Sequence, residues 1–292
     1  MVDNESIEEE IVTLTNKGLL DIEAFNWTKE EEAYIKALSE KGYLTIATKI
    51  HSAVYMPNDD GTVSGFHYKV VEAFADMAGI KVDLKLVEWN DYFYREGEDL
   101  EKVKTDPNYS YVPTLLEEVD LYIDGITSLP WREKMFDIIK FVPSKQMIIT
   151  RKGEEPESIS DLNNKTCSMV TDTSMAANMN LLIEEHDLTI TYDYVDDFDL
   201  MGQKVIDGEV DFTVVDSDAA YRLINQNEIL TVALPISQMQ IMGWAIHKDD
   251  KVLNSVLQKY LVYAQNNQLL DRYWEESYGV TFIDYLKILQ LD

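Results

Sequence analysis

The sequence predicts an α/β protein of two lobes, in which each lobe is a mostly parallel β-sheet flanked by helices and two hinge strands join the lobes. Strand-like and helix-like apolar patterns alternate in two separate series along the chain, as they do in proteins with parallel sheets. Two long extended stretches, near residues 143–149 and 236–242, follow these series. A chain of 292 residues with 46% hydrophobic content is long enough for two cores of ordinary size.

Residues 1–42 are predicted to form an acidic extension that ends in a helix. In "TKEEEAYIKAL", Thr28 and Glu31 have the spacing of a capping box, in which each side chain accepts a hydrogen bond from the other residue's backbone. An apolar stripe at helical spacing follows them. A short helix is therefore expected ahead of the first strand.

Residues 43–87 are predicted to form a βαβ unit. The stretch "YLTIATKI" has alternating apolar residues, and a loop rich in turn formers follows it. From Phe66 the apolar spacing becomes helical, and Gly79 suits the end of that helix. Alternation resumes at Ile80, so we expect two parallel strands with a right-handed crossover.

The first lobe is predicted to comprise residues 43–145 and 241–292. After a polar stretch, "VDLYIDGI" reads as its third strand, and the chain is again extended from Ile138 to Ile149. After the second lobe, "QMQIMGWAIHK" returns as an extended segment. A helical C-terminus is expected from Val252 to about Tyr278.

The second lobe is predicted to comprise residues 146–240, with strands and helices in alternation. This alternation again favours a mostly parallel sheet. The expected elements are a strand at Thr166 to Val170, a helix at Ser174 to His186, the strand "TITYDYV", a helix at Phe198 to Ile206, the strand "VDFTVVD", a helix at Ser217 to Asn225, and the strand "ILTVAL".

The composition excludes some classes of function. The net charge of -29 and the pI near 4.3 create a field that repels phosphate backbones, so nucleic acid is not expected as a partner. The single cysteine, Cys167, allows no internal disulfide and falls in an expected buried strand. No apolar run is long enough to cross a bilayer, and the opening "MVDNESIEEE" is acidic where a signal peptide is basic, so a soluble chain is expected.

The two lobes are expected to enclose a ligand between them. In open α/β sheets, ligands bind beyond the carboxyl ends of the strands, and two facing lobes form a cleft there. A chain that crosses between the lobes twice makes a hinge. The loop after "VDLYIDGI" carries Thr127 and Arg132 and is expected at this cleft.

Three stretches together resemble a known family. They are "GTVSGFHYKVVEAFADMAGIKVDLKLVEW", "VDLYIDGITSLPWREKMFDIIKFV" and "VIDGEVDFTVVDSDAAY". From about Tyr43 to Gly279 the chain resembles the bacterial extracytoplasmic solute-binding proteins of family 3, the amino-acid-binding type with the type II periplasmic-binding fold. The resemblance implies a monomeric periplasmic or extracellular protein that closes on a small zwitterionic or carboxylate ligand and delivers it to the permease of an ABC transporter.

The resemblance assigns the ligand's α-carboxylate to a group in the first lobe. The family's glycine, threonine and arginine pattern is met by Gly125, Thr127 and Arg132. A guanidinium is a planar fork that matches a carboxylate with two hydrogen bonds. The alternative is a surface arginine that pairs with Glu133 or Asp137.

In the second lobe, the resemblance assigns the α-ammonium group to Asp216, which ends the strand "FTVVD". Capping of the next helix is the alternative role of Asp216. The loop "VTDTSMA" matches the family's anion-binding loop, where Thr173 and Ser174 precede a helix N-terminus. Asp172 stands where the family has glycine, so it either points away or indicates a ligand other than a plain α-amino acid.

Three aromatic residues are candidates to cover the ligand's side chain. His51, Tyr55 and Trp89 lie in loops that follow strands, and the family often places rings there. Packing in the core is the alternative, above all for Trp89. His67, at a helix start, is expected to be structural or exposed.

No catalytic or metal-binding motif is present. The chain lacks HExxH, P-loop, GxGxxG and GxSxG patterns, and its four histidines do not have the spacing of metal ligands. We therefore expect no metal and no cofactor, and we predict that the protein is not an enzyme. A lyase or dehydratase on the same fold is the remaining catalytic alternative.

A regulatory role is the main alternative to transport. The helix "WTKEEEAYIKAL" and the ending "ESYGVTFIDYLKIL" resemble the solute-binding-like domains of sensor kinases and of membrane-bound lytic murein transglycosylase F. In those proteins the domain regulates an output. The insertion between Trp89 and Glu118 is longer than transport receptors usually carry, which favours this branch.

Overall fold

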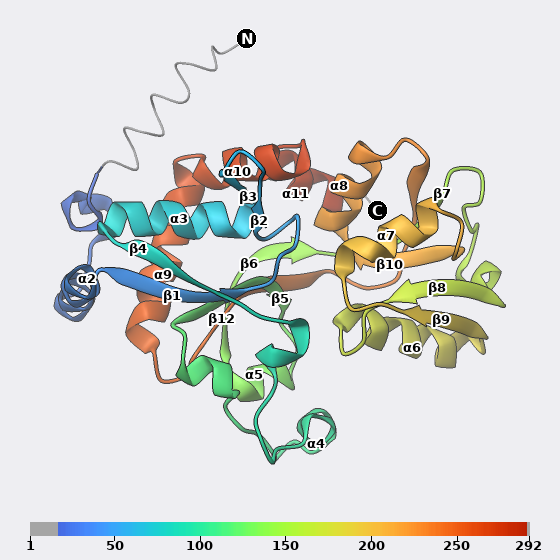
Figure 1. Cartoon of the computed structure of the whole chain (residues 1–292), viewed down its shortest axis with the longest axis horizontal. Helices are drawn as coiled ribbons and strands as arrows, with labels where there is room; N and C mark the ends of the chain where they lie inside the picture. Colours follow the sequence, from blue (N-terminus) through green and yellow to red (C-terminus); the bar gives the residue numbers. More distant parts are fainter. Residues whose placement is uncertain (1–16, 291–292) are drawn as a thin grey trace, which may run out of the picture.

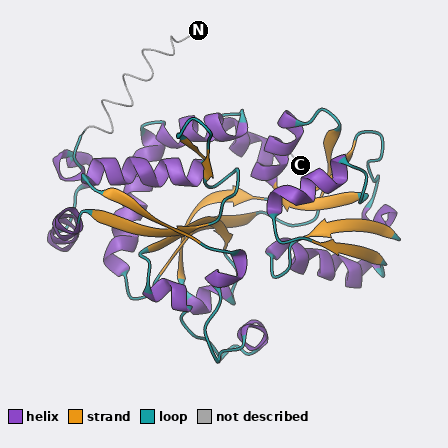
Figure 2. Cartoon of the chain, viewed as in Figure 1, coloured by secondary structure: helices purple, strands orange, loops and turns teal. Residues whose placement is uncertain are grey.

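The computed structural model describes residues 17–290 and contains two five-stranded sheets flanked by helices (Figures 1 and 2). Residues 1–16 of the predicted extension lie outside the described part. The first lobe is built on the sheet with strand order β4-β1-β5-β12-β6, and the second on the sheet with order β11-β7-β10-β8-β9. The predicted fold class is confirmed.

The described elements follow the alternation expected from the sequence. The strands of the first sheet are β1 (Tyr43–Thr48), β4 (Lys81–Leu86), β5 (Leu121–Thr127), β6 (Asp137–Ser144) and β12 (Gln240–Ile246). Those of the second are β7 (Gln146–Arg151), β8 (Lys165–Met169), β9 (Ile190–Tyr194), β10 (Phe212–Asp216) and β11 (Leu230–Pro235). A short hairpin joins β2 (Met56–Pro57) and β3 (Val63–Ser64).

The helices cover both faces of the sheets. In the first lobe they are α2 (Lys29–Lys41), α3 (Phe66–Ala78), α4 (Leu100–Thr105), α5 (Arg132–Met135), α9 (Lys251–Asn266), α10 (Leu269–Tyr278) and α11 (Phe282–Gln290). In the second they are α6 (Ser174–His186), α7 (Phe198–Ile206) and α8 (Ser217–Gln226). Short 3-10 turns are η1 (Leu19–Asp21), η2 (Glu23–Phe25), η3 (Trp89–Tyr92), η4 (Thr114–Glu117) and η5 (Ile159–Leu162). Within residues 17–290, none of the helices combines the length and the apolar character of a membrane span.

One strand of each sheet is reversed, and the reversal follows from the crossings between the lobes. Strand β12 is antiparallel to β5 and β6, and β7 is antiparallel to β10 and β11. The chain leaves each lobe at the carboxyl edge of its sheet, so the next strand starts at that edge of the other sheet and runs away from it. The carboxyl ends of the parallel strands β5 and β10 consequently both face the boundary between the lobes.

Each lobe has its own apolar core. In the first lobe, buried residues such as Leu44, Phe66 and Trp244 pack on one face of the sheet, and a second cluster around Tyr122 and Phe136 packs elsewhere in that lobe. The second lobe is held by a separate cluster of buried residues, among them Met169 and Phe212. Cys167 is buried in this second core, as predicted.

The N-terminal helix and the βαβ unit form as predicted. Thr28 and Glu31 make the reciprocal capping box at the start of α2. Strand β1 pairs with β4 in parallel, with α3 between them in the chain.

The predicted helical C-terminus is confirmed. It is broken between α9 and α10, where Gln268 has a φ of 61° and cannot continue a right-handed helix. A further helix, α11, follows Gly279. The hydroxyl of Tyr285 in α11 contacts the carbonyl oxygen of Pro143 and the hydroxyl of Ser217, so this helix contacts both lobes close to the crossing strands.

Candidate ligand-binding site

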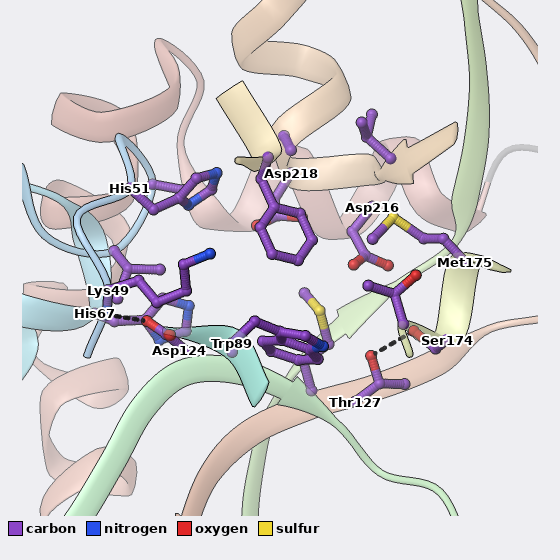
Figure 3. Close-up of a pocket in the computed structure, with 18 of the residues that line it drawn as sticks. Lys49, His51, His67, Trp89, Asp124, Thr127, Ser174, Met175, Asp216 and Asp218 are labelled. Atoms are coloured by element: carbon purple, nitrogen blue, oxygen red, sulfur yellow. Dashed lines mark hydrogen bonds between the residues drawn. The ribbon is translucent and has the colours of Figure 1, made fainter. Parts of the chain in front are cut away.

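A cavity of about 90 Å³ lies between the two lobes (Figure 3). This volume is several times the roughly 10–15 Å³ that one water needs, so a small molecule fits. The first lobe lines the cavity with Lys49, His51, Trp89, Asp124, Thr127 and Arg132, and the second lobe with Thr173, Ser174, Asp216, Asp218 and Arg222.

Arg132 is buried at the start of α5, five residues after Thr127, and is only 1% exposed. Its Nη1 donates to the carbonyl oxygen of Thr127 at 3.1 Å, and its Nη2 donates to that of Asp172 at 3.4 Å. The centre of the guanidinium lies 5.0 to 5.3 Å from the ring centroids of Trp131, Phe93 and Trp89. The protein therefore holds the cation mainly by carbonyl oxygens and aromatic faces.

Arg132 has no ion pair with the residues that the structure describes, and its buried Nε has no hydrogen-bond partner. Burial lowers the pKa of Arg132 to about 9, against the opposing effect of Asp216 and Asp172. The surface alternative, an ion pair with Glu133 or Asp137, is not what the structure shows: those carboxylates pair with Lys140 and Lys251. A buried guanidinium without a carboxylate partner is a site for an anion.

Hydroxyl groups from both lobes surround this anion site. The Oγ1 of Thr127 and the Oγ of Ser174 lie 3.1 Å apart across the boundary, and Gln146 Nε2 donates to the same Ser174 oxygen at 2.9 Å. Thr173 is the N-cap of α6, where its Oγ1 accepts from the backbone N–H of Ala176 at 3.1 Å. The free N–H groups at this helix start also favour an anion.

Gly125 lines the cavity with a φ of +60°. A Cβ atom there would lie 3.0 Å from Nε2 of His67, so both the backbone conformation and the close ring favour glycine. His67 is buried and accepts a hydrogen bond from Trp244 Nε1 at 2.9 Å. His67 also lines the cavity. Of the two expected alternatives, a structural position fits its burial and this hydrogen bond, and exposure does not.

Asp172 points away from the cavity. This is the first of the two alternatives expected for an aspartate at the position where the family has glycine. Its φ of 58° is a conformation that aspartate tolerates better than most residues. Its carboxylate accepts from the ammonium group of Lys104 at 2.7 Å, and it does not line the cavity. Lys104 lies on α4, in the insertion that follows Trp89, so this ion pair joins the two lobes.

Two carboxyl groups line the cavity from the second lobe, and Asp216 is the one whose charge acts on Arg132. Asp216 ends β10 and accepts from Ser144 Oγ at 3.4 Å, and although it occupies the N-cap position of α8 it makes no capping bond. Asp218 accepts from Tyr278 Oη at 3.2 Å, and its buried Oδ1 has no partner. Burial raises the pKa of Asp216, and the neighbouring Asp218 raises it further. Burial also raises the pKa of Asp218. The pair can receive a cation.

The opposite end of the cavity contains charged residues that the sequence analysis did not select. Lys49 directly follows β1, and Asp124 lies in β5 near its carboxyl end. Arg222 pairs with Asp199 at 2.9 Å, and His51 lies 3.6 Å from the same carboxylate oxygen. Burial is the main cause that lowers the pKa of His51 to about 4. The sequence could have indicated Lys49 and Asp124 by their position at the ends of strands. It could have indicated Asp218 and Arg222 by their place on the first turns of α8.

Two of the three residues predicted to cover the ligand line the cavity, and the third does not. Trp89 and His51 line the cavity, and the buried Nε1 of Trp89 has no partner. Tyr55 does not line the cavity, so its predicted placement is wrong. Its ring packs edge-on against the Tyr68 ring of α3, with 5.0 Å between the ring centroids. No group of three or more potential metal ligands occurs within residues 17–290.

Comparisons with solved structures identify the fold. An ancestral amino acid-binding protein, described as a precursor of cyclohexadienyl dehydratase, matches with a TM-score of 0.67 at 18% identity, over 84% of this chain and 99% of that one. The solute receptor for L-cysteine of Neisseria gonorrhoeae matches with a TM-score of 0.65 at 17% identity, over 86% of this chain and 94% of that one. The chain has the fold of the family 3 solute-binding proteins. No family model matches the sequence.

Curated relatives of this solute-binding fold carry the name membrane-bound lytic murein transglycosylase F. The relative from Saccharophagus degradans is 29% identical over 257 residues, which are 86% of this chain and 48% of that protein. The relative from Pseudomonas fluorescens is 25% identical over 257 residues, 84% of this chain and 48% of that protein. The chain thus spans about half the length of the curated relatives that it matches.

These relatives overturn the prediction that the chain is not an enzyme. Their name is that of an enzyme, a lytic transglycosylase. The absence of short catalytic motifs was the basis of the prediction, and it was insufficient because such motifs cover few of the known kinds of active site.

The ion pair between Lys104 and Asp172 yields a prediction about closure. Lys104→Met removes a partly exposed ion pair that exists only while the lobes are together, so we expect the open form to gain about two- to fivefold in population. Small-angle X-ray scattering of the ligand-free protein measures this as a larger radius of gyration.

Lys102→Met is the matched control, because the Lys102 ammonium lies over the Tyr109 ring on the same insertion and does not reach the second lobe. Equal radii for Lys104→Met and Lys102→Met would contradict a role of this ion pair in closure.

Proposed function

We propose that the protein is a ligand-sensing domain whose two lobes close on a small amino acid. The observation that carries the proposal is the buried guanidinium of Arg132, which has no carboxylate partner among the described residues. A ligand α-carboxylate supplies that partner, with the hydroxyls of Thr127 and Ser174 beside it. The ligand's ammonium group then meets Asp216 and Asp218.

Closure follows from the division of these groups between the lobes. Arg132 and Thr127 belong to the first sheet's lobe, while Ser174, Asp216 and Asp218 belong to the second. A ligand that contacts both sets binds the closed form more tightly than the open one, and it shifts the population by that difference. A zwitterion suits this arrangement because each of its charges loses water only where an opposite charge replaces it.

The names of the structural neighbours support an amino acid as the ligand. They include an arginine-binding protein bound to arginine and a receptor for L-cysteine. The volume of the cavity supports a single amino acid rather than a glycan strand. Binding outside the cytoplasm, in the periplasm or at the cell surface, fits both the receptor and the "membrane-bound" relatives.

The names of the sequence relatives favour a regulatory output over transport. The chain matches about half of a transglycosylase, so we propose that closure on the ligand controls a separate catalytic or signalling partner. Delivery to an ABC transporter stays a prediction, and a direct test is whether the protein binds a permease or a murein-degrading partner in the presence of its ligand.

The carboxylate site is tested with Arg132→Ala. In the wild-type protein, a saturating amino acid ligand raises the thermal unfolding temperature because it binds only the folded state. We expect Arg132→Ala to fold and to lose at least about tenfold in affinity, since a buried charge-assisted contact is removed. A thermal-shift screen of the natural amino acids, followed by calorimetry, measures both.

Arg95→Ala is the control, because Arg95 pairs with Glu117 on the surface of the same lobe. Unchanged ligand shifts in the Arg132 variant would defeat the proposal, as would the absence of any shift in the wild-type protein.

The raised pKa of Asp216 predicts a pH dependence of binding. A ligand ammonium group favours the ionised form of Asp216, so ligand binding releases the proton of this carboxyl. The release occurs between the ordinary carboxyl pKa of 3.8 and the raised value of about 7, and the affinity for the ligand rises with pH across this window. In the absence of ligand the same shift makes the closed protein lose stability as pH rises through the window. Calorimetry in buffers of different ionisation enthalpy counts the released protons.

Asp216→Asn should reduce this proton release, because of the two carboxyls with a raised pKa only Asp218 then remains. A ligand affinity that is flat from about pH 5 to about pH 8 in the wild-type protein would show that Asp216 does not contact an ammonium group.

A further inference from the structure

The end of the cavity opposite the anion site carries a second buried cation, Lys49. Lys49 directly follows β1 and is 6% exposed. In Figure 3, Lys49 and His51 lie at one end of the cavity, while Thr127 and Ser174 lie at the other, and the Lys49 side chain points into the space between them. None of the roles described above uses this ammonium group.

The contacts of the Lys49 ammonium leave its charge unpaired. It donates to the carbonyl oxygen of Asp196 at a long 3.4 Å and lies 4.9 Å from the centroid of the Phe198 ring. Within residues 17–290, no carboxylate comes within ion-pair distance of it. A carbonyl and a ring face stabilise an ammonium group only in part, so its burial is costly unless an anion joins it.

The acidic residues at this end are already engaged. Asp124 accepts hydrogen bonds from Tyr92 Oη, from Thr48 Oγ1 at 2.7 Å and from the backbone N–H of Lys49 at 3.4 Å.

The other carboxylate at this end, Asp199, accepts from Arg222 at 2.9 Å and from Ser52 Oγ at 2.7 Å. The buried Nε of Arg222 has no partner, so this end offers a further free donor. Free donors therefore outnumber free acceptors at this end.

We infer that the ligand carries a second carboxylate, at the end of its side chain, and that Lys49 binds it. The inference rests on the proposed amino-acid binding and adds the class of ligand: an α-amino dicarboxylate. Such a molecule brings an opposite charge to the cavity groups that lack an ion pair. Its α-carboxylate pairs with Arg132, its ammonium group with Asp216 and Asp218, and its distal carboxylate with Lys49.

Other classes of amino acid leave a charge unmatched. A basic ligand side chain would place a second cation beside Lys49. An apolar ligand side chain would leave the ammonium group of Lys49 buried without a partner. A side-chain amide would accept a hydrogen bond from Lys49 but would bring no negative charge, and hydrogen bonds between neutral and charged groups are weaker than those between two opposite charges.

The test is calorimetry with L-glutamate, L-aspartate, L-glutamine, L-leucine and L-lysine on the wild-type protein and on Lys49→Met. Methionine keeps most of the length of the side chain and removes the charge. We expect a dicarboxylate to bind the wild-type protein at least about tenfold more tightly than L-glutamine or L-leucine. In Lys49→Met this preference should disappear, mainly through loss of dicarboxylate affinity.

Lys69→Met is the matched control, because Lys69 pairs with Glu72 on α3 and does not line the cavity. Thermal unfolding without ligand reports whether Lys49→Met folds, and Lys49→Gln replaces it if it does not. The panel on the wild-type protein stands without either variant.

Three outcomes overturn the inference. A wild-type preference for L-leucine or L-lysine, or an unchanged dicarboxylate preference in Lys49→Met, would overturn it while amino-acid binding through Arg132 stood. Failure of every natural amino acid to bind would overturn the proposed function and, with it, this inference.

Discussion

The buried guanidinium of Arg132, which has no carboxylate partner among the described residues, is the constraint on which the rest of this site depends. A charge in such a place requires compensation from many groups. Carbonyl oxygens of Thr127 and Asp172, one from each lobe, and three aromatic rings provide part of it. The remainder is left to a ligand, and this incomplete compensation couples ligand binding to the position of the lobes.

The fold makes this coupling possible through its two crossings. The parallel strands β5 and β10 end at the boundary between the two sheets (Figure 1). The cavity there has charged groups from both lobes. Contacts such as Thr127 with Ser174 and Lys104 with Asp172 exist only when the lobes meet. Each is weak alone, so a ligand's pairing energy can decide between open and closed forms.

Much of the fold could be predicted from the sequence because the periodicities are regular. The bounds of α6 and α7 and the parallel pairing of β1 with β4 follow from apolar spacing and turn residues. The break at Gln268 could not be predicted, since glutamine gives no local signal for a left-handed conformation and the surrounding packing imposes it.

Within the site, prediction was good for residues that follow a motif and poor for those placed by topology alone. Arg132 and Asp216 were assigned from the resemblance to the family's motifs, and both line the cavity. Lys49 and Asp218 were missed because a lysine just after a strand, or an aspartate in the first turn of a helix, reads as a solvated residue until the facing lobe is in place. Tyr55 does not line the cavity, since its ring packs against Tyr68 of α3 instead.

A crystal structure of the protein with the amino acid that stabilises it most is the most direct test of the central claim. We expect a ligand carboxylate within about 3 Å of the Arg132 guanidinium, with both lobes in contact with the same molecule. A bound ligand whose carboxylate lies elsewhere, with Arg132 still paired only to carbonyl oxygens, would contradict it.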